Sequence, residues 1–129
     1  MTELDEQLTL PPEPASAAAA RRFAARALGG VDVDLALVTL LVSELVSNVV
    51  LHARTPLTVA VRTSGRRVRV TVSDRSPTLP APKTYAPDAV TGRGLTMVAS
   101  SCADWGVEPT PGGKAVWFEV PMEQGASLS

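Results

Sequence analysis

The first half of the chain contains two stretches whose apolar residues recur with the spacing of helices. An alanine-rich stretch over 16–28 starts at Ser16, a residue type that caps helices, and stops at a pair of glycines. A more apolar stretch follows Asp32 and Asp34, either of which can cap it, and runs to about Ala53. The pattern predicts two consecutive helices, and the composition of the second indicates that most of it is buried.

After the second helix the period changes to two, which is typical of strands. Residues 57–63 and 67–73 alternate between apolar and polar side chains and are separated by a Ser-Gly-Arg turn. A second pair of alternating runs, 104–108 and 114–120, flanks a turn rich in proline and glycine. Each pair predicts an antiparallel hairpin.

The two hairpins are separated by a proline-rich loop over 75–91 and a short helix that begins at Leu95. A loop of this length is unusual inside a compact domain, so we expect it to have a function, such as a lid over a ligand.

The predicted order is helix, helix, hairpin, loop, helix, hairpin. This order favours a two-layer α/β sandwich in which helices cover one face of a mixed, mostly antiparallel sheet. A length of 129 residues fits one domain. We expect a flexible N-terminal arm over 1–14, a folded domain over 15–121 and a disordered tail over 122–129.

Charge and composition exclude several classes of function. The net charge of −1 gives no overall field that would attract nucleic acid or an anionic membrane. The single cysteine excludes an internal disulfide and a zinc site built on cysteines. The acidic N-terminus lacks the basic and apolar regions of a signal peptide, and no long apolar run is free of polar residues. We therefore expect a cytoplasmic protein that contacts neither nucleic acid nor membrane.

A polar stripe interrupts the apolar second helix. Glu44, Asn48 and His52 follow one another at steps of four residues, with Ser47 beside them, so they share one side of the helix. Such a stripe can simply face water. A solvated face usually carries several Lys and Arg, however, whereas this one carries short hydrogen-bonding groups and one carboxylate. A half-buried carboxylate needs a partner or a function.

Two further sequence features suggest ligand contacts. Gly92 and Gly94 flank Arg93 just before Leu95, at a predicted junction of loop and helix. Glycines let the backbone approach an anion closely, and the free N–H groups of a helix start can bind phosphate, although a glycine there can also be only a hinge. Asp74 ends the second predicted strand, where it either shapes the turn or accepts a hydrogen bond from a ligand.

Four segments of the chain together resemble one known family. The segments are ELVSNVVLHA, VTVSDRSPTLP, GRGLTMVASSCADWG and PGGKAVWFEV, in this order. They are similar to the motifs of the GHKL ATP-binding fold, and within it to the anti-sigma-factor serine kinases and their small single-domain actinobacterial relatives. The resemblance extends over residues 15–121.

The resemblance implies a role for each part of the predicted site. Asn48 would coordinate the Mg²⁺ that bridges the phosphates of ATP, and Glu44 would be the general base. Asp74 would accept a hydrogen bond from the amino group of adenine. Backbone contacts to phosphate would come from the junction of loop and helix: Gly92, Arg93, Gly94 and Leu95. The chemistry agrees, because Mg²⁺ takes few ligands from protein and phosphoryl transfer depends mostly on positioning and charge.

Three positions depart from the family pattern. Ser76 and Thr78 stand where the broader fold has glycines after the strand. Ala115 occupies the position where the fold commonly has a threonine that helps to hold adenine. These departures bear on nucleotide affinity more than on the fold.

Two functions of different classes remain open at this point. The first is an anti-sigma-type serine protein kinase that uses Mg-ATP to phosphorylate a small antagonist protein in transcriptional regulation. Its partners would be an anti-anti-sigma-like protein, with a sigma factor and a second copy of the chain as further candidates. The second is a regulatory module that binds ATP or a protein partner without catalysis. A histidine-kinase catalytic fragment is disfavoured, because no helix with a phosphoacceptor histidine precedes the domain.

Overall fold

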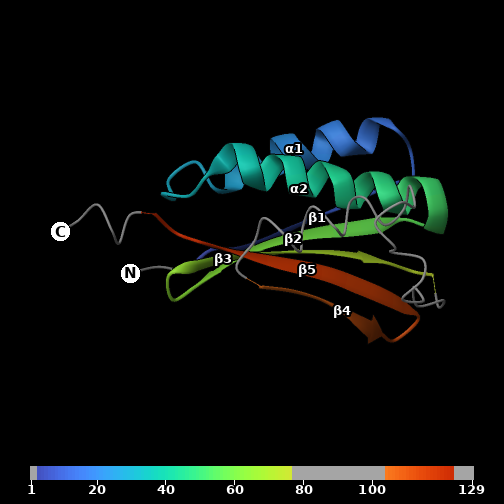
Figure 1. The fold of residues 1–129 in the computed structure, drawn as a ribbon. Helices are drawn as coiled ribbons and strands as arrows, with labels where there is room; N and C mark the ends of the chain where they lie inside the picture. Colours follow the sequence, from blue (N-terminus) through green and yellow to red (C-terminus); the bar gives the residue numbers. More distant parts are fainter. Residues whose placement is uncertain (1–2, 77–103, 124–129) are drawn as a thin grey trace, which may run out of the picture.

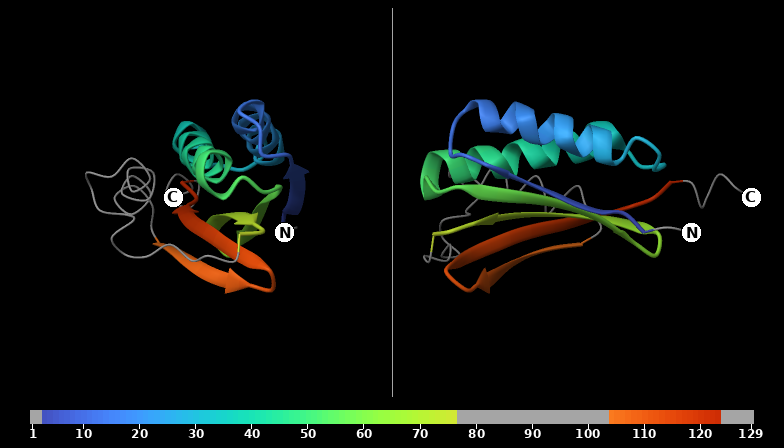
Figure 2. Two further views of the ribbon diagram at one scale, coloured as in Figure 1. Left: turned by 90° about the vertical axis from the view of Figure 1, so that its right-hand side faces the viewer. Right: turned by 180° about the vertical axis from the view of Figure 1, so that it is seen from behind.

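The computed structural model describes residues 3–76 and 104–123 of the chain. In this part the chain forms one five-stranded antiparallel sheet in the order β1-β2-β3-β5-β4, covered on one face by helices (Figures 1 and 2). The elements are β1 (Asp5–Leu10), α1 (Ala15–Ala27), α2 (Leu35–Asn48), the π-helix η1 (Val49–Ala53), β2 (Leu57–Ser64), β3 (Arg67–Asp74), β4 (Asp104–Thr110) and β5 (Gly113–Pro121). The predicted two-layer α/β sandwich is confirmed.

Helices α1 and α2 begin close to where the sequence predicts, but only one of the predicted caps forms. Asp34 caps α2, and its carboxylate accepts a hydrogen bond from the backbone N–H of Leu37 at 3.1 Å. Ser16 does not cap α1, because the helix begins one residue earlier, after Pro14. The Ser16 hydroxyl is buried inside the first turn and donates instead to the carbonyl of Pro11 at 2.6 Å.

Strand β1 corrects the expectation of a flexible N-terminal arm over 1–14. All residues of β1, Asp5–Leu10, pair antiparallel with Leu57–Arg62 of β2. The backbone N–H of Leu4 also donates to the Thr63 hydroxyl at 2.8 Å. Leu8 and Leu10 pack against the core, so the strand gains apolar burial and pairs the backbone groups that the edge of β2 would otherwise expose.

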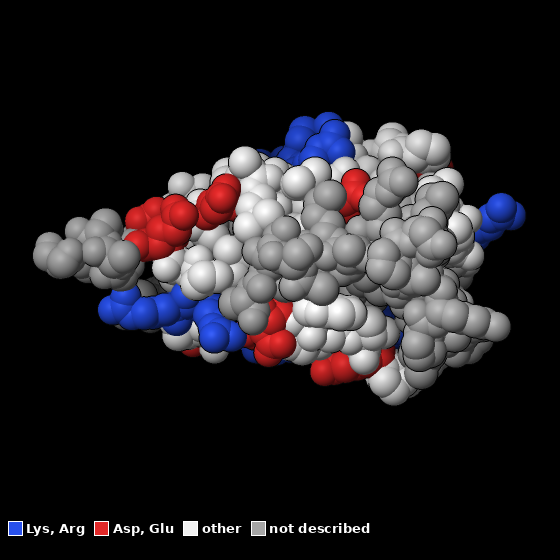
Figure 3. All heavy atoms as spheres, in the orientation of Figure 1, with Lys and Arg blue, Asp and Glu red and all other residues white. Residues whose placement is uncertain are grey.

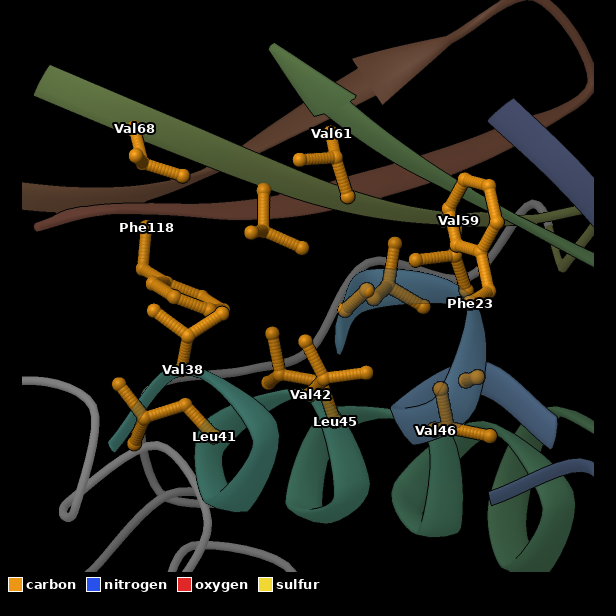
Figure 4. Packing of buried hydrophobic residues seen from close by; sticks show 14 of the residues in the cluster. Phe23, Val38, Leu41, Val42, Leu45, Val46, Val59, Val61, Val68 and Phe118 are labelled. Carbon is orange, nitrogen blue, oxygen red and sulfur yellow. The ribbon is translucent and has the colours of Figure 1, made fainter. Parts of the chain in front are cut away.

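The core lies between the helices and the sheet face that they cover (Figure 4). Because side chains alternate along a strand, every second residue of β2 and β3 points to this layer, and most of these residues are valines. The close-up shows side chains from both helices and three strands converging: Phe23, Val38, Leu41, Val42, Leu45, Val46, Val59, Val61, Val68 and Phe118.

Helix α2 together with η1 is unusually apolar. The 19 residues Leu35–Ala53 are long and apolar enough to cross a membrane, by length and composition alone. In this fold the same helix packs on the sheet, and its residues Leu41, Val42, Leu45 and Val46 are buried there. Core packing therefore explains the apolar residues on the buried side of this helix.

The sheet face opposite these helices carries a cluster of aromatic and charged side chains. The guanidinium of Arg69 lies 3.9 Å from the centroid of the Trp117 ring. Arg69 and Arg67 both donate to the carboxylate of Glu119, at 2.9 and 3.0 Å. Burial raises the pKa of Glu119, but the hydrogen bonds and charges of the two arginines outweigh it, so the pKa lies below its usual value. Figure 3 shows basic side chains gathered at the end of the sheet where β2 turns into β3.

Gly106 allows Trp117 to lie flat against β4. The two residues are cross-strand partners, and a Cβ added at Gly106 would lie 2.8 Å from the indole ring. Arg69 stacks on the same ring, which restricts its movement. We expect Gly106→Ala to lower the free energy of unfolding by about 1–3 kcal/mol, the usual effect of overpacking. Urea unfolding measures this, with Gly30→Ala as the control because a Cβ added at Gly30 would meet no atom within 4 Å. Equal stability of the two variants would contradict the prediction.

Candidate functional site

Glu44 and Asn48 lie one turn apart at the border between the buried and the exposed sides of α2. Both side chains are half-buried, and so is Ser47 between them. The residues next to them in sequence, Leu45 and Val46, point into the core. The core packing of α2 thus fixes the rotation of the helix and holds the two polar groups on one edge, as the sequence predicts.

Two exposed leucines flank these polar groups along the helix. Leu40, one turn before Glu44, is 46% exposed, and Leu51, just beyond Asn48, is 56% exposed. These are the exposed large hydrophobic residues among those that the structure describes. This edge of the helix therefore combines a carboxylate and a carboxamide with two singly exposed leucines, which are common on protein surfaces.

The helix changes type directly after Asn48. Residues Val49–Ala53 form the π-helix η1, closed by a hydrogen bond of 2.9 Å from the N–H of Arg54 to the carbonyl of Val49. Arg54 then ends the helix in the left-handed conformation, with φ of 57°. His52 lies in this π-turn and is exposed, whereas Glu44 and Asn48 are half-buried. Single π-turns inside helices are frequent at functional sites.

Asp74 is the last residue of β3, and its carboxylate is almost fully buried. The side chain is 2% exposed, and Oδ2 lies 2.9 Å from Nζ of Lys114, whose side chain is 13% exposed. The other oxygen, Oδ1, accepts from the backbone N–H of Ser76 at 2.8 Å. Asp74 therefore shapes the turn after β3, which is one of the two roles that the sequence suggested for it. It also forms a buried ion pair with Lys114.

Lys114 is a site residue that the sequence analysis missed. It is the second residue of β5 and lies directly opposite Asp74, because β3 and β5 are antiparallel neighbours. The preceding Gly113 lets the two strands approach, since a Cβ there would overlap the Asp74 carbonyl. Because a buried carboxylate is normally paired with a cation, the sequence could have suggested a basic partner for Asp74. The sequence alone did not show that β3 and β5, far apart along the chain, would be paired.

The end of α2 and the Asp74 end of the sheet meet at one end of the molecule (Figures 1 and 2). Thr55, two residues after η1, accepts a hydrogen bond from the N–H of Arg75 at 2.9 Å. Leu57, which begins β2, is paired with Asp74. The structure therefore brings the half-buried polar edge of the helix and the buried ion pair to the same region.

The remaining predicted site residues lie outside the described residues: Gly92, Arg93, Gly94 and Leu95. The same holds for Thr78, most of the predicted lid over 75–91, and the predicted tail from 124 onwards. Ala115 is buried and pairs with Ser73 on β3.

The donor set fits Mg²⁺ and a purine nucleotide. Asn48 offers a carboxamide oxygen and Glu44 a carboxylate, which are the oxygen ligands that Mg²⁺ prefers. Within residues 3–76 and 104–123 no cluster of three or more His, Cys, Asp or Glu could hold a metal on its own. Mg²⁺ in nucleotide sites usually keeps several waters and takes only one or two ligands from protein. The paired Asp74 and Lys114 place a hydrogen-bond acceptor beside a donor, which is the chemistry needed to contact the edge of a base.

Sequence comparison assigns the chain to a family. The family model described as the histidine kinase-like ATPase domain matches residues 10–120. The chain therefore belongs to the histidine kinase-like ATPase domain family, and it is an ATPase-type domain of the GHKL class. No curated protein matches the chain in sequence.

Two solved structures have the same fold. The RsbU and RsbW domains of Rv1364c from Mycobacterium tuberculosis match with a TM-score of 0.69 and 22% identity, over 92% of this chain and 32% of that one. The histidine kinase domain of the blue-light activated histidine kinase of Erythrobacter litoralis EL346 matches with a TM-score of 0.54 and 21% identity, over 92% of this chain and 64% of that one. This chain thus spans about a third of the first protein and under two thirds of the second.

Proposed function

We propose that the protein is an anti-sigma-type serine kinase, which binds Mg-ATP and phosphorylates a serine of a small antagonist protein. Membership of an ATPase-type family supports nucleotide binding. One of the two similar solved structures contains an RsbW domain, which supports a comparison with the anti-sigma-factor kinases within the family. The observation that carries the proposal is the position of Glu44 and Asn48, one turn apart on a half-buried edge flanked by exposed leucines.

Each site residue has a distinct role in this proposal. Asn48 holds the metal through its carboxamide oxygen, and the bound Mg²⁺ neutralises phosphate charge. Glu44, one turn earlier, accepts the proton of the attacking serine hydroxyl. Asp74 contacts the amino group of adenine. Backbone N–H groups at Gly92, Arg93, Gly94 and Leu95 contact phosphate.

The partners and location follow from the same proposal. The phosphorylated protein is an anti-anti-sigma-like antagonist, and the second partner is a sigma factor, so the protein acts in transcriptional regulation in the cytoplasm. Association of two copies of the chain is a further part of the proposal. The test is incubation of the purified protein with labelled Mg-ATP and candidate antagonists encoded nearby. Label on a serine of one candidate supports the proposal, and no transfer to any candidate contradicts the kinase assignment.

A prediction from the proposed function concerns the metal. Asn48→Ala removes an oxygen ligand without opening a core cavity, because Asn48 is only half-buried. We expect the affinity for ATP in the presence of Mg²⁺ to fall at least about tenfold. Calorimetric titration with and without Mg²⁺ measures this. Thr39→Ala, a half-buried position near the start of the same helix, is the matched control. Unchanged Mg-ATP binding by Asn48→Ala would remove Asn48 from the metal site.

A second function, a regulatory module without catalysis, is supported by one observation. Both oxygens of the Asp74 carboxylate already accept hydrogen bonds from within the chain. A carboxylate engaged in this way has less hydrogen-bonding capacity left for a base, so the domain would bind nucleotide weakly and act through a protein partner alone. Tight binding of an antagonist without phosphate transfer would favour this alternative over the kinase.

A further inference from the structure

The ion pair of Asp74 and Lys114 is more than a way to neutralise a buried charge. The two groups are 2.9 Å apart, and both side chains are largely withdrawn from water. An ammonium group has three N–H donors, and a carboxylate can accept about four hydrogen bonds. Among the described residues, Lys114 uses one donor on Asp74, and Asp74 uses one acceptor position on each oxygen. Both groups therefore keep hydrogen-bonding capacity for a ligand.

The order of these groups matches the edge of adenine. The 6-amino group of adenine is a donor, and the neighbouring ring atom N1 is an acceptor. A carboxylate beside an ammonium offers the complementary order, an acceptor next to a donor. A lone carboxylate would satisfy the amino group and leave N1 to water. With Lys114 in place, the pair can satisfy both atoms at once.

We propose that Lys114 is a base-reading residue, which donates to N1 of adenine while Asp74 accepts from the 6-amino group. The inference rests on the proposed binding of ATP and adds a specificity residue to it. It also accounts for the departure at Ala115. That residue lies opposite Ser73, one position further along β5 than Lys114, and has no polar group to offer. The adjacent residue, Lys114, supplies the second contact to the base instead.

The alternative role for Lys114 is purely structural. In that case its ammonium only neutralises Asp74, and the ring nitrogen N1 makes no difference to binding. The two roles differ in what happens when a single atom of the ligand is changed, so the ligand can be varied while the protein stays intact. This is useful because removal of Lys114 would leave the buried Asp74 without its cation.

The experiment compares three triphosphates on the unmodified protein by calorimetric titration: ATP, 1-deaza-ATP and purine riboside triphosphate. In 1-deaza-ATP the N1 acceptor is replaced by C–H, and purine riboside triphosphate lacks the 6-amino group. We expect each analogue to bind about tenfold or more weakly than ATP, as for loss of a hydrogen bond to a charged group. Equal affinity for ATP and 1-deaza-ATP would overturn the inference and leave ATP binding intact. If none of the three binds, the proposed function fails and this inference with it.

A variant then tests whether the preference for ATP over 1-deaza-ATP depends on Lys114. Lys114→Met should bind ATP more weakly and should no longer distinguish ATP from 1-deaza-ATP, because the two changes remove the same hydrogen bond. Circular dichroism verifies that the variant is folded. Arg62→Met removes an exposed cation elsewhere in the sheet and should keep the tenfold preference for ATP. If folded Lys114→Met retained the full preference, N1 would be read by another group and the inference would be wrong. If the variant does not fold, the comparison of analogues on the unmodified protein decides.

Discussion

Glu44→Gln is expected to slow phosphate transfer to the antagonist protein by about 10²–10⁴-fold, the usual contribution of a general base. The affinity for ATP should stay within a few-fold, because glutamine keeps the size and polarity of the side chain and loses only its ability to take a proton. Glu44 is half-buried and one turn from Asn48, so if Asn48 holds the metal, the carboxylate lies near the transferred phosphate. A role in proton transfer therefore affects the rate far more than binding.

The measurement is a single-turnover reaction with labelled Mg-ATP and an antagonist that the parent protein phosphorylates. Glu108→Gln changes an exposed carboxylate on β4 and should react at the parent rate. A parent-like rate for Glu44→Gln would leave the kinase assignment standing but remove Glu44 as its base. A loss of ATP affinity as large as the loss of rate would instead indicate that Glu44 acts in binding.

Local patterns predicted much of the fold. The period of the apolar residues located α1, α2 and both hairpins, because each element buries one face on the other layer and the spacing records that burial. Asp34, one of the two predicted caps of α2, does cap the helix. A cap can be predicted locally because it depends only on residues within one turn. The polar edge of α2 with Glu44 and Asn48 could also be predicted, because helical geometry alone places the two side chains together.

Features that depend on distant parts of the chain could not be predicted in this way. Strand β1 looks polar on its own and is stabilised only when β2 lies beside it. The π-helix after Asn48 has no signature in composition. Lys114 reaches Asp74 only because β5 inserts between β3 and β4, which is a property of the whole sheet.

The Asp74–Lys114 pair should also be important for stability. Lys114→Met leaves a carboxylate that is 2% exposed without its cation, and breaking a buried pair from one side typically costs about 3–5 kcal/mol. A domain of this size is stable by only about 5–15 kcal/mol, so the loss should be evident as a large shift in the midpoint of urea unfolding.

The double variant Asp74→Asn with Lys114→Met separates the cost of an unpaired charge from the value of the pair itself. Asparagine can still accept from the N–H of Ser76, and no buried charge remains. Removing both charges of a buried pair avoids the cost of a lone buried charge, although the amide of asparagine leaves an N–H group unpaired, so the double variant should recover part of the stability that the single variant loses. A double variant as unstable as Lys114→Met would mean that the loss comes from packing of the lysine chain. The recovery expected here would show that the stability of this end of the sheet depends on charge balance at Asp74.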